Sequence, residues 1–385
     1  MHKNPSPLTL SELKDLSSQI KLWGNELGFI KLGITDTNLS EYTPDFKKWL
    51  AKNYHGDMLY MQNNIDKREF PELLVPNAMS VIVVAMNYLT DNTMADILTK
   101  KDKAAISRYA VGRDYHKLMR KRLQSLANKI EDRVGKFGYR AFVDSAPVLE
   151  KPLAEKAGLG WSAKNTLLIN KEEGSWFFLG TLFTDLPLPT DSKEKESSCG
   201  KCKACINICP TNAIVAEGQL DARKCISYLT IENKGVIPLK FREAIGNRIY
   251  GCDDCQLICP WNRYAKLSTE DDFKSRNNFS NIGLLELFSW SEQTFLKNTE
   301  GSAIRRIGYN SWIRNIAVAL GNAPYKKEVE DILTERKNFS DIVAREHILW
   351  ALDKQKLKKL GHGKDTDKKR ARNDRIWLKL SQKTS

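Results

Sequence analysis

Apolar positions along the first half of the chain follow two different periods. A spacing of three and four residues predicts a helix that ends near Gly28, through Leu10, Leu13, Leu16, Ile20, Trp23 and Leu27. The same spacing from Tyr115 to Val134 predicts a longer helix, stopped by Gly135. Continuous apolar runs predict buried strands at 81–86, 141–143 and 176–182. Because helices alternate with strands, we expect residues 1–188 to form an α/β domain.

The second half of the chain has a different pattern. Leu186-Pro-Leu-Pro189 followed by DSKEKESS reads as a polar linker into a second domain, 189–270. Beyond about residue 270 the strand signals stop, and apolar segments at 316–320 and 348–352 recur 32 residues apart. That period predicts paired-helix repeats of the HEAT-like type over 271–353. Two copies are few, so a chance similarity stays the alternative.

Charge is concentrated at the C-terminus. The formal net charge is +14, and residues 354–385 carry twelve Lys or Arg against three Asp. One interpretation is a solvated basic tail, and the other is a phosphate-binding arm for nucleic acid. Ile376, Trp377, Leu378 and Leu380 favour docking of part of this tail onto the protein.

Export and membrane insertion are not indicated. The N-terminus MHKNPSPLTLSELK has no apolar run of the signal-peptide type, and no stretch approaches the ~20 apolar residues of a membrane span. We therefore expect a cytoplasmic protein with no membrane partner.

All eight cysteines fall between Cys199 and Cys259, with the spacing of iron–sulfur ligands. The first run is Cys199-x-x-Cys202-x-x-Cys205-x-x-x-Cys209-Pro, and the second is Cys252-x-x-Cys255-x-x-x-Cys259-Pro. Each [4Fe–4S] cluster needs four thiolates, so eight cysteines predict two clusters in a ferredoxin-like domain. A zinc ribbon is a weaker interpretation, because it does not need the third cysteine or the Cys-Pro end. A disulfide framework is also disfavoured, because such frameworks belong to small secreted chains.

The ligands of each cluster follow from the ferredoxin pattern, in which the fourth cysteine of each run binds the other cluster. Ile249 stands where the second run needs its first cysteine, and Cys225 is the spare thiol. We therefore assign Cys199, Cys202, Cys205 and Cys259 to cluster 1. Cluster 2 receives Cys209, Cys225, Cys252 and Cys255.

Three segments of the first domain contain candidate site residues, namely 107–116, 142–150 and 158–167. Asp144 follows an apolar strand, where α/β sheets bind ligands, and it can donate a proton if burial raises its pKa. The alternative is a helix N-cap before a helix that starts near Pro147. Arg108 and His116 are equally open to functional and structural interpretations.

Nucleotide binding is not indicated by these segments. Residues 158–163 match Gly-x-Gly-x-x-Ala, but a helix precedes the match and a strand follows it, the reverse of the dinucleotide fingerprint. The chain also lacks the Gly-x-x-x-x-Gly-Lys-Ser/Thr loop of ATP-binding proteins.

Several long segments, in order, resemble the epoxyqueuosine reductase family. They are SRYAVGRDYH, FVDSAPVLEKPLAEKAGLGWSAKNTLLI, the Cys199 run, KCISYLTIENKG and GCDDCQLICPWN. The resemblance covers about residues 10–350 and includes the displaced Cys225. It implies an α/β cobalamin-binding domain (1–188), a ferredoxin-like domain with two [4Fe–4S] clusters (189–270) and a helical-repeat tRNA-binding domain (271–353), followed by the basic tail (354–385).

The resemblance also implies an activity, the reduction of epoxyqueuosine to queuosine at the wobble position of tRNAs with GUN anticodons. In this family cluster electrons produce Co(I), which attacks the epoxide, and Asp144 matches the proton donor. The Asp-x-His-x-x-Gly motif of a lower cobalt ligand is absent here, as in the family. Lys234 is a candidate tRNA contact, and the candidate cobalamin contacts are Arg68, Ser107, Arg108, Asp144, Lys164, Asn165 and Leu168.

Two alternative functions remain at this point. A reductive dehalogenase pairs a corrinoid with two clusters, but such enzymes are usually exported through a twin-arginine signal that this N-terminus lacks. A ferredoxin-type electron carrier would leave the 107–116 and 142–167 segments without a role. We expect a monomeric oxidoreductase supplied by an external electron donor.

Overall fold

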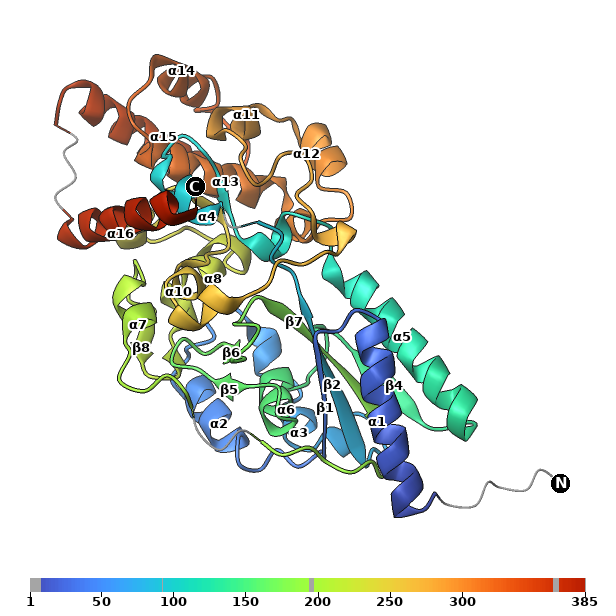
Figure 1. The fold of residues 1–385 in the computed structure, drawn as a ribbon. Helices are drawn as coiled ribbons and strands as arrows, with labels where there is room; N and C mark the ends of the chain where they lie inside the picture. The colour runs from blue at the N-terminus through green and yellow to red at the C-terminus, as the bar shows by residue number, and fades with distance from the viewer. Residues whose placement is uncertain (1–7, 92, 194–196, 363–366, 385) are drawn as a thin grey trace.

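The first domain is built on a four-stranded antiparallel sheet. A computed structural model describes residues 8–91, 93–193, 197–362 and 367–384. The strand order is β1 (Lys31–Thr35), β2 (Ser80–Asn87), β7 (Phe177–Thr184) and β4 (Tyr139–Phe142) (Figure 1). Part of the expected polar linker, residues 194–196, lies outside the described residues.

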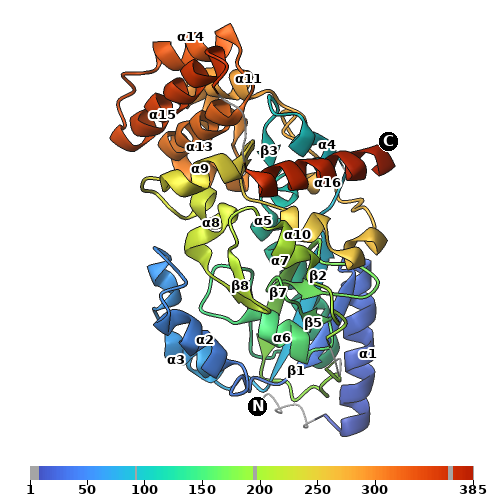
Figure 2. The ribbon, with the colours of Figure 1, turned by 90° about the vertical axis from the view of Figure 1, so that its left-hand side faces the viewer.

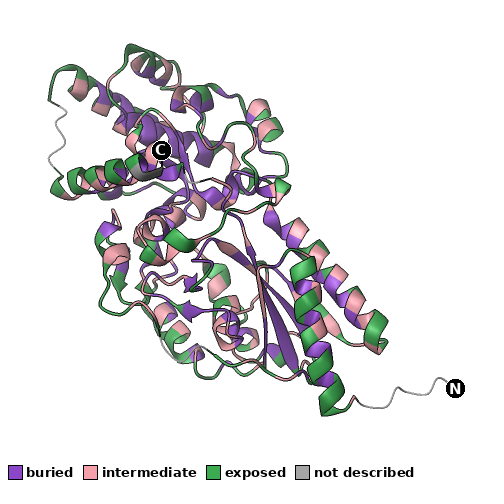
Figure 3. Cartoon of the chain, in the orientation of Figure 1, coloured by how far each residue is buried: buried purple, intermediate pink, exposed green. Residues whose placement is uncertain are grey.

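Helices cover both faces of this sheet. In β2, Ile82, Val84 and Met86 face α1 (Leu10–Glu26) and α5 (Tyr115–Val134). The alternate residues Val81, Val83 and Ala85 face α6 (Glu150–Lys156). Because β2 is buried on both faces, its sequence is a continuous apolar run rather than an alternating one (Figure 3).

The predicted elements of this domain occur, with one difference in topology. The helix at 115–134 has the predicted bounds, and the three apolar runs lie in β2, β4 and β7. Every strand pair of the main sheet is antiparallel. The rule that places ligands at the carboxyl ends of parallel strands therefore does not apply to Asp144. Strand β1 is not predicted by the sequence, because its short KLGIT segment has little apolar pattern.

A separate arm of the first domain reaches the cluster domain. It contains α2 (Thr43–Ala51) and α3 (Ile65–Glu69), which Figure 2 shows on the side of the sheet opposite α1. The Tyr228 hydroxyl donates to Asp57, and the Trp49 indole donates to the Leu220 carbonyl. These bonds fix the arm to the cluster domain.

The cluster domain consists of short elements around the cysteine loops. They are α7 (Ala204–Ile208), β8 (Ile214–Ala216), β9 (Gln219–Leu220), α8 (Ile226–Ile231), α9 (Leu239–Ile245), β10 (Arg248–Tyr250) and α10 (Asp254–Leu257). Strand β10 pairs in parallel with β3 (Ala105–Ile106) of the first domain. The two domains therefore share a strand pair and do not meet at a simple linker.

The C-terminal part is helical in the described residues. It contains α11 (Leu284–Ser289), α12 (Glu292–Asn298), α13 (Gly308–Asn322), α14 (Lys327–Glu335) and α15 (Ile342–Lys359). The two recurring apolar segments lie in α13 and α15, which pack on each other. Arg314 of α13 donates to the carbonyls of Asn233 and Gly235, so this helix also anchors the cluster domain. The HEAT-like assignment stays a prediction.

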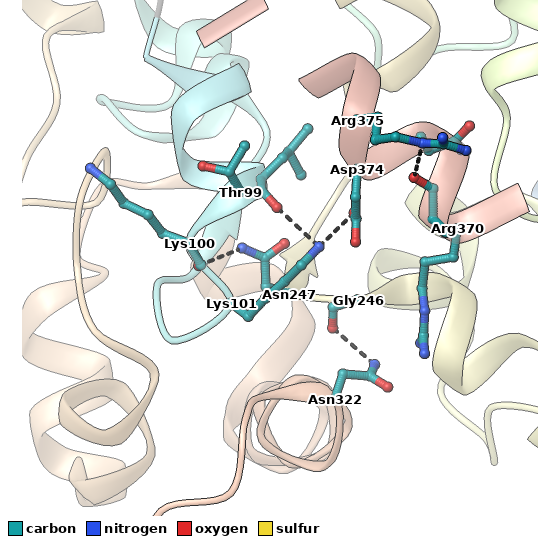
Figure 4. Close-up of polar contacts among 12 residues, drawn as sticks. Thr99, Lys100, Lys101, Gly246, Asn247, Asn322, Arg370, Asp374 and Arg375 are labelled. Atoms are coloured by element: carbon teal, nitrogen blue, oxygen red, sulfur yellow. Dashed lines mark hydrogen bonds and ion pairs between the residues drawn. The ribbon is translucent and has the colours of Figure 1, made fainter. Parts of the chain in front are cut away.

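The basic C-terminus folds onto the protein. Residues 354–359 complete α15, so the predicted boundary at 354 divides a helix. Helix α16 (Lys368–Thr384) packs on α4 (Met94–Thr99), and the Trp377 side chain is only 1% exposed. Figure 4 shows Lys101 bridging the two helices through its 2.7 Å ion pair with Asp374. Most of this region is therefore a docked helix.

Among the described residues, no helix has the length and apolar character that crossing a membrane requires.

Candidate active site

The eight thiols form two separate groups. Cys199, Cys202, Cys205 and Cys259 line a cavity of about 250 Å³ together with Trp261 and Tyr264. The Trp161 indole donates to Cys199 Sγ at 3.5 Å. The other four, Cys209, Cys225, Cys252 and Cys255, line a second cavity of about 490 Å³. This grouping is the one that the spacing predicts.

The thiol arrangement suits clusters better than single metal ions. Among the described residues, no three His, Cys, Asp or Glu side chains converge on one ion-sized point. The four cysteine ligands of a [4Fe–4S] cluster bind four different irons, so their sulfur atoms surround a cluster-sized space and do not converge on one point. Burial raises the pKa of Cys252 and of Cys255 well above the usual value. Bound iron would supply the positive charge that keeps such thiols ionised.

The loop that carries Cys252 is held tightly against the first domain. Gly251 has φ +70°, and a Cβ there would lie 2.5 Å from the Cβ of Ser107. Only glycine permits this close approach. The Ser107 hydroxyl and the Arg108 amide both donate to the buried Asp253 carboxylate. Ser107 is thereby placed in the wall of the larger cavity.

Asp144 reaches the same cavity from a strained loop. It follows β4 and has φ +55°, an uncommon conformation for a residue other than glycine. Its carboxylate is 61% exposed and accepts a hydrogen bond from the Tyr115 hydroxyl at 3.0 Å. Helix α6 begins at Glu150, and its N-cap is Leu149. The N-cap interpretation of Asp144 is therefore wrong.

A charged network lies behind Asp144. His116 Nε2 is 3.5 Å from the Asp144 carboxylate, and His116 Nδ1 is 2.7 Å from Asp114. Arg306 forms an ion pair with Asp114. The hydrogen bond to His116 lowers the pKa of Asp144. The condition that the sequence set for proton donation, a pKa raised by burial, is therefore not met, because the hydrogen bond to His116 outweighs burial.

His116 is the group in this network whose pKa is raised by its neighbours. Burial alone would lower the pKa of His116, but its bonds to Asp114 and Asp144 raise it above 6.5. Because the pKa of His116 is raised and that of Asp144 is lowered, a proton shared by the pair favours His116. Tyr115 stacks on Phe178 with ring centroids 3.7 Å apart, which fixes the start of α5 and both side chains.

Glu150 secures the Asp144 loop. Its Oε1 accepts the backbone N–H of Asp144 at 2.8 Å. Burial raises the pKa of Glu150 to about 8. The side chain therefore holds Asp144 in its positive-φ conformation from inside the domain.

The 158–167 segment forms another wall of the larger cavity. It leads from α6 into β5 (Trp161–Ser162) and a turn before β6 (Leu168–Ile169), an order that excludes the dinucleotide fingerprint. Thr166 has φ +68°, and its carbonyl accepts from Lys151 Nζ at 2.8 Å. Thr166 and Asp144 both line the cavity, so two strained non-glycine residues meet at one site.

The structure separates the candidate cobalamin contacts into two groups. Ser107, Asp144 and Asn165 line the larger cavity. Leu168 lies in the core between the sheet and α6, and Lys164 lines the smaller cavity, where it bonds Glu217 and the Gly200 carbonyl.

The remaining candidates lie outside both cavities. Arg108 is buried against Thr93 and Asp91. Arg68 lies in α3, where it donates to the Tyr60 carbonyl. The exposed Lys234 follows α8, close to Glu232.

Several residues of this site are not indicated by the sequence. Tyr115 and Glu150 were within the candidate segments but were not selected, because nothing in their spacing shows that they contact Asp144. Arg306 and Arg120 contact Asp114 and Ser145 from distant positions in the chain. No sequence signal marks such a pairing.

The larger cavity has features that fit a corrinoid. Phe177, Phe178 and Tyr109 give it an aromatic wall, and no histidine belongs to its described lining. A corrinoid there would have no protein histidine on the cobalt. Ser107, Asp144 and Asn165 add polar side chains to this lining, and such groups can hydrogen-bond the amide side chains of a bound corrinoid.

Comparisons with known sequences agree with this site. Residues 68–145 match the family described as epoxyqueuosine reductase QueG, DUF1730. Residues 198–262 match the 4Fe-4S double cluster binding domain, which confirms the predicted cluster domain. The chain is 55% identical to the epoxyqueuosine reductase of Vibrio cholerae over 348 residues, which are 90% of this chain and 94% of that protein.

Two solved structures are similar over nearly the whole chain. One is an epoxyqueuosine reductase with an epoxyqueuosine-modified tRNA-Tyr stem loop, with a TM-score of 0.82, 27% identity and coverage of 97% of this chain and 100% of that one. The other is the Bacillus subtilis epoxyqueuosine reductase with its aspartate-bearing catalytic loop swung out of the active site. Its TM-score is 0.79 at 26% identity, with the same coverage.

Proposed function

The chain belongs to the epoxyqueuosine reductase family, and we propose that it converts epoxyqueuosine to queuosine in tRNA with a GUN anticodon. The conversion removes the epoxide oxygen as water and consumes two electrons and two protons. We place this reaction in the cytoplasm, where the tRNA substrate is found. The reductive dehalogenase and electron-carrier hypotheses receive no support from these relatives.

One observation carries the proposal. A single cavity is lined both by Asp144 and by the four thiols of the predicted cluster 2. An electron source and a proton source therefore face the same space. A simple electron carrier would not need the proton source, since electron transfer alone requires no acid.

Cofactors supply the redox chemistry in this proposal. Two [4Fe–4S] clusters would be held by the two thiol groups, and cobalamin by the larger cavity. When bound, cobalamin supplies a reduced cobalt centre that is nucleophilic toward an epoxide carbon. The aromatic wall and Ser107 would hold its ring, while Asn165 contacts the Cys255 carbonyl at the boundary with cluster 2.

The residues around Asp144 manage the proton. Opening of the epoxide develops negative charge on its oxygen, which an acid must neutralise. Asp144 is the exposed end of the Asp114–His116–Asp144 chain, so it delivers a proton that His116 holds in the free protein. Arg306 and Asp114 keep the imidazole oriented. Tyr115 and Glu150 keep the carboxylate pointed into the cavity.

Basic side chains near Asp144 fit a tRNA stem loop. Arg120 bonds Ser145 of the Asp144 loop, Arg306 bonds Asp114, and Lys234 lies near Glu232. All three are exposed. Phosphate contacts from such residues position a nucleic acid without reading its sequence. A stem loop held there would present its wobble base to Asp144.

The test is direct turnover. The anaerobically purified protein, reconstituted with both clusters and cobalamin, is mixed with an epoxyqueuosine-containing tRNA stem loop and a chemical reductant. Nucleoside mass spectrometry should show queuosine appearing as epoxyqueuosine disappears. Parallel reactions without cobalamin, and with a stem loop that lacks the modified base, serve as controls. Absence of queuosine from the complete reaction would disprove the proposed function.

A further inference from the structure

The two thiol groups differ in their access to solvent. Of the eight cysteines, Cys202 alone is exposed, and it belongs to the predicted cluster 1. The ligands of the predicted cluster 2 line the cavity that contains Asp144. Cluster 1 is therefore the outer cluster, and cluster 2 is the one beside the reaction site.

The two groups are close enough to act in series. Asn165 lines both cavities and donates to the Cys255 carbonyl at 3.3 Å. Electrons that reach the outer group can consequently pass inward without crossing solvent.

The surface at the outer group is basic and aromatic. Lys201 and Lys203 flank Cys202 in the chain, and both are exposed. Arg263 is also exposed and lies 4.7 Å from the ring centroid of Tyr264, whose residue is 50% exposed. We call these five residues the Cys202 face: Lys201, Cys202, Lys203, Arg263 and Tyr264.

The cations of the Cys202 face have no carboxylate partner among the described residues. Within the described part of the chain, Lys201, Lys203 and Arg263 form no ion pair. The nearby Glu217 is already paired with Lys164. Arginine and tyrosine are residues that protein interfaces favour.

We propose that the Cys202 face is the docking site of a small, acidic one-electron carrier protein. The inference rests on the proposed function, because only an enzyme that consumes electrons needs a donor. Each encounter oxidises the carrier by one electron and reduces the outer cluster by one electron, and no atom crosses the interface. Opposite charge raises the association rate of such short-lived complexes, whose interfaces are small.

The kinetic test uses the protein with both clusters and cobalamin, without tRNA. A reduced flavodoxin, which is small and acidic, is mixed with it anaerobically, and cluster bleaching is followed by stopped flow. Lys201→Glu/Lys203→Glu should lower the second-order rate constant by about 10-fold or more at low salt. Rising ionic strength should slow the unaltered protein much more than the variant.

A matched control changes net charge equally but elsewhere. Lys14 in α1 and Lys297 in α12 are exposed. Both helices lie on the opposite side of Figure 1 from α7. Lys14→Glu/Lys297→Glu should change the rate by less than about 2-fold, since steering is local. Reduced methyl viologen, a small cation, should bleach all three proteins to the same final extent, which shows that the clusters are intact. Arg263→Glu provides an independent variant for the same prediction.

A second readout does not depend on electron transfer. Carbodiimide coupling of oxidised flavodoxin should join its carboxylates to Lys201 or Lys203. Equal flavodoxin rates in the variants and the unaltered protein, or coupling at other lysines, would overturn the proposal. So would a loss of tRNA stem-loop affinity with unchanged flavodoxin kinetics, because the face would then bind nucleic acid. A protein that accepts flavodoxin electrons normally but makes no queuosine would fail only the proposed function.

Discussion

Replacement of Asp144 by Asn isolates acidity from geometry. Asn tolerates the positive φ of this position as well as Asp does, so the loop should keep its conformation. The Asn carbonyl oxygen can still accept the Tyr115 hydroxyl, which donates at 3.0 Å in the unaltered protein. The backbone N–H that Glu150 accepts is unchanged. Only the proton-carrying capacity and the negative charge are lost.

The expected effect is large on turnover and small on binding. A positioned general acid contributes about 10²- to 10⁴-fold to a rate, so the single-turnover rate constant should fall by that factor. At 1.36 kcal/mol per factor of ten, this loss is about 3–5 kcal/mol of transition-state stabilisation. Iron content, cobalamin binding and stem-loop affinity should stay within about twofold, because Asn keeps the shape of the side chain and a hydrogen-bond acceptor at the same place.

The pH profile provides a second test. The pKa of His116 is raised, so His116 is protonated at low pH and loses its proton as pH rises through this elevated value. The rate of the unaltered protein should therefore fall on the alkaline side, above pH 6.5. In Asp144→Asn, His116 loses one of its two carboxylate partners, and its pKa should move down.

The assay is anaerobic single turnover with excess pre-reduced protein, followed by mass spectrometry of the released nucleosides at several pH values. Asp144→Ala, which also removes the acceptor for Tyr115, is the comparison variant. A normal rate for Asp144→Asn, or an alkaline limb that does not move, would refute the assignment of Asp144 and His116 to one proton chain.

Four further predictions follow from the same structure. Cys225→Ala should leave about four irons per chain by iron and sulfide analysis, since cluster 1 keeps its ligands, and eight irons would remove Cys225 from the ligand set. Glu150→Gln keeps an acceptor for the Asp144 amide and should retain more turnover than Glu150→Ala, and equal rates would argue against a positioning role. Trp377→Ala removes a buried side chain at a cost of about 3–5 kcal/mol, so hydrogen exchange should accelerate in α16, and unchanged protection would contradict its docking through this residue. Among the side chains that the structure describes, the exposed cations of α16 are Lys368, Arg372, Arg375 and Lys379. Neutralising them should reduce the slope of log K against log salt for tRNA binding by a little under one unit per lost phosphate contact. Identical slopes would mean that these cations serve solubility only.

Local sequence determined the elements whose chemistry is periodic or spaced. The apolar positions of α5 recur at helical spacing, so its bounds could be predicted from Tyr115 to Val134. The cysteine spacing was enough to predict two groups of four, because ligation of a cube imposes a separation along the chain. The same spacing singled out Cys225 as the displaced ligand.

Only the tertiary structure decided how these parts meet. The antiparallel order of the sheet depends on which strands pair, and no single strand records its partner. The basic C-terminus has the composition of a solvated tail, yet the pocket formed by α4 and the cluster domain buries Trp377 and turns it into a docked helix. Such pockets consist of residues that are far apart in sequence.

The protonation of the site was likewise decided in three dimensions. From sequence, Asp144 was a candidate proton donor on the condition that burial raised its pKa. In the folded protein His116 lies beside it, held by Asp114 and Arg306, and the sign of the shift is reversed. Electrostatic energies depend on distances between charges, and folding, rather than the order of residues, sets those distances.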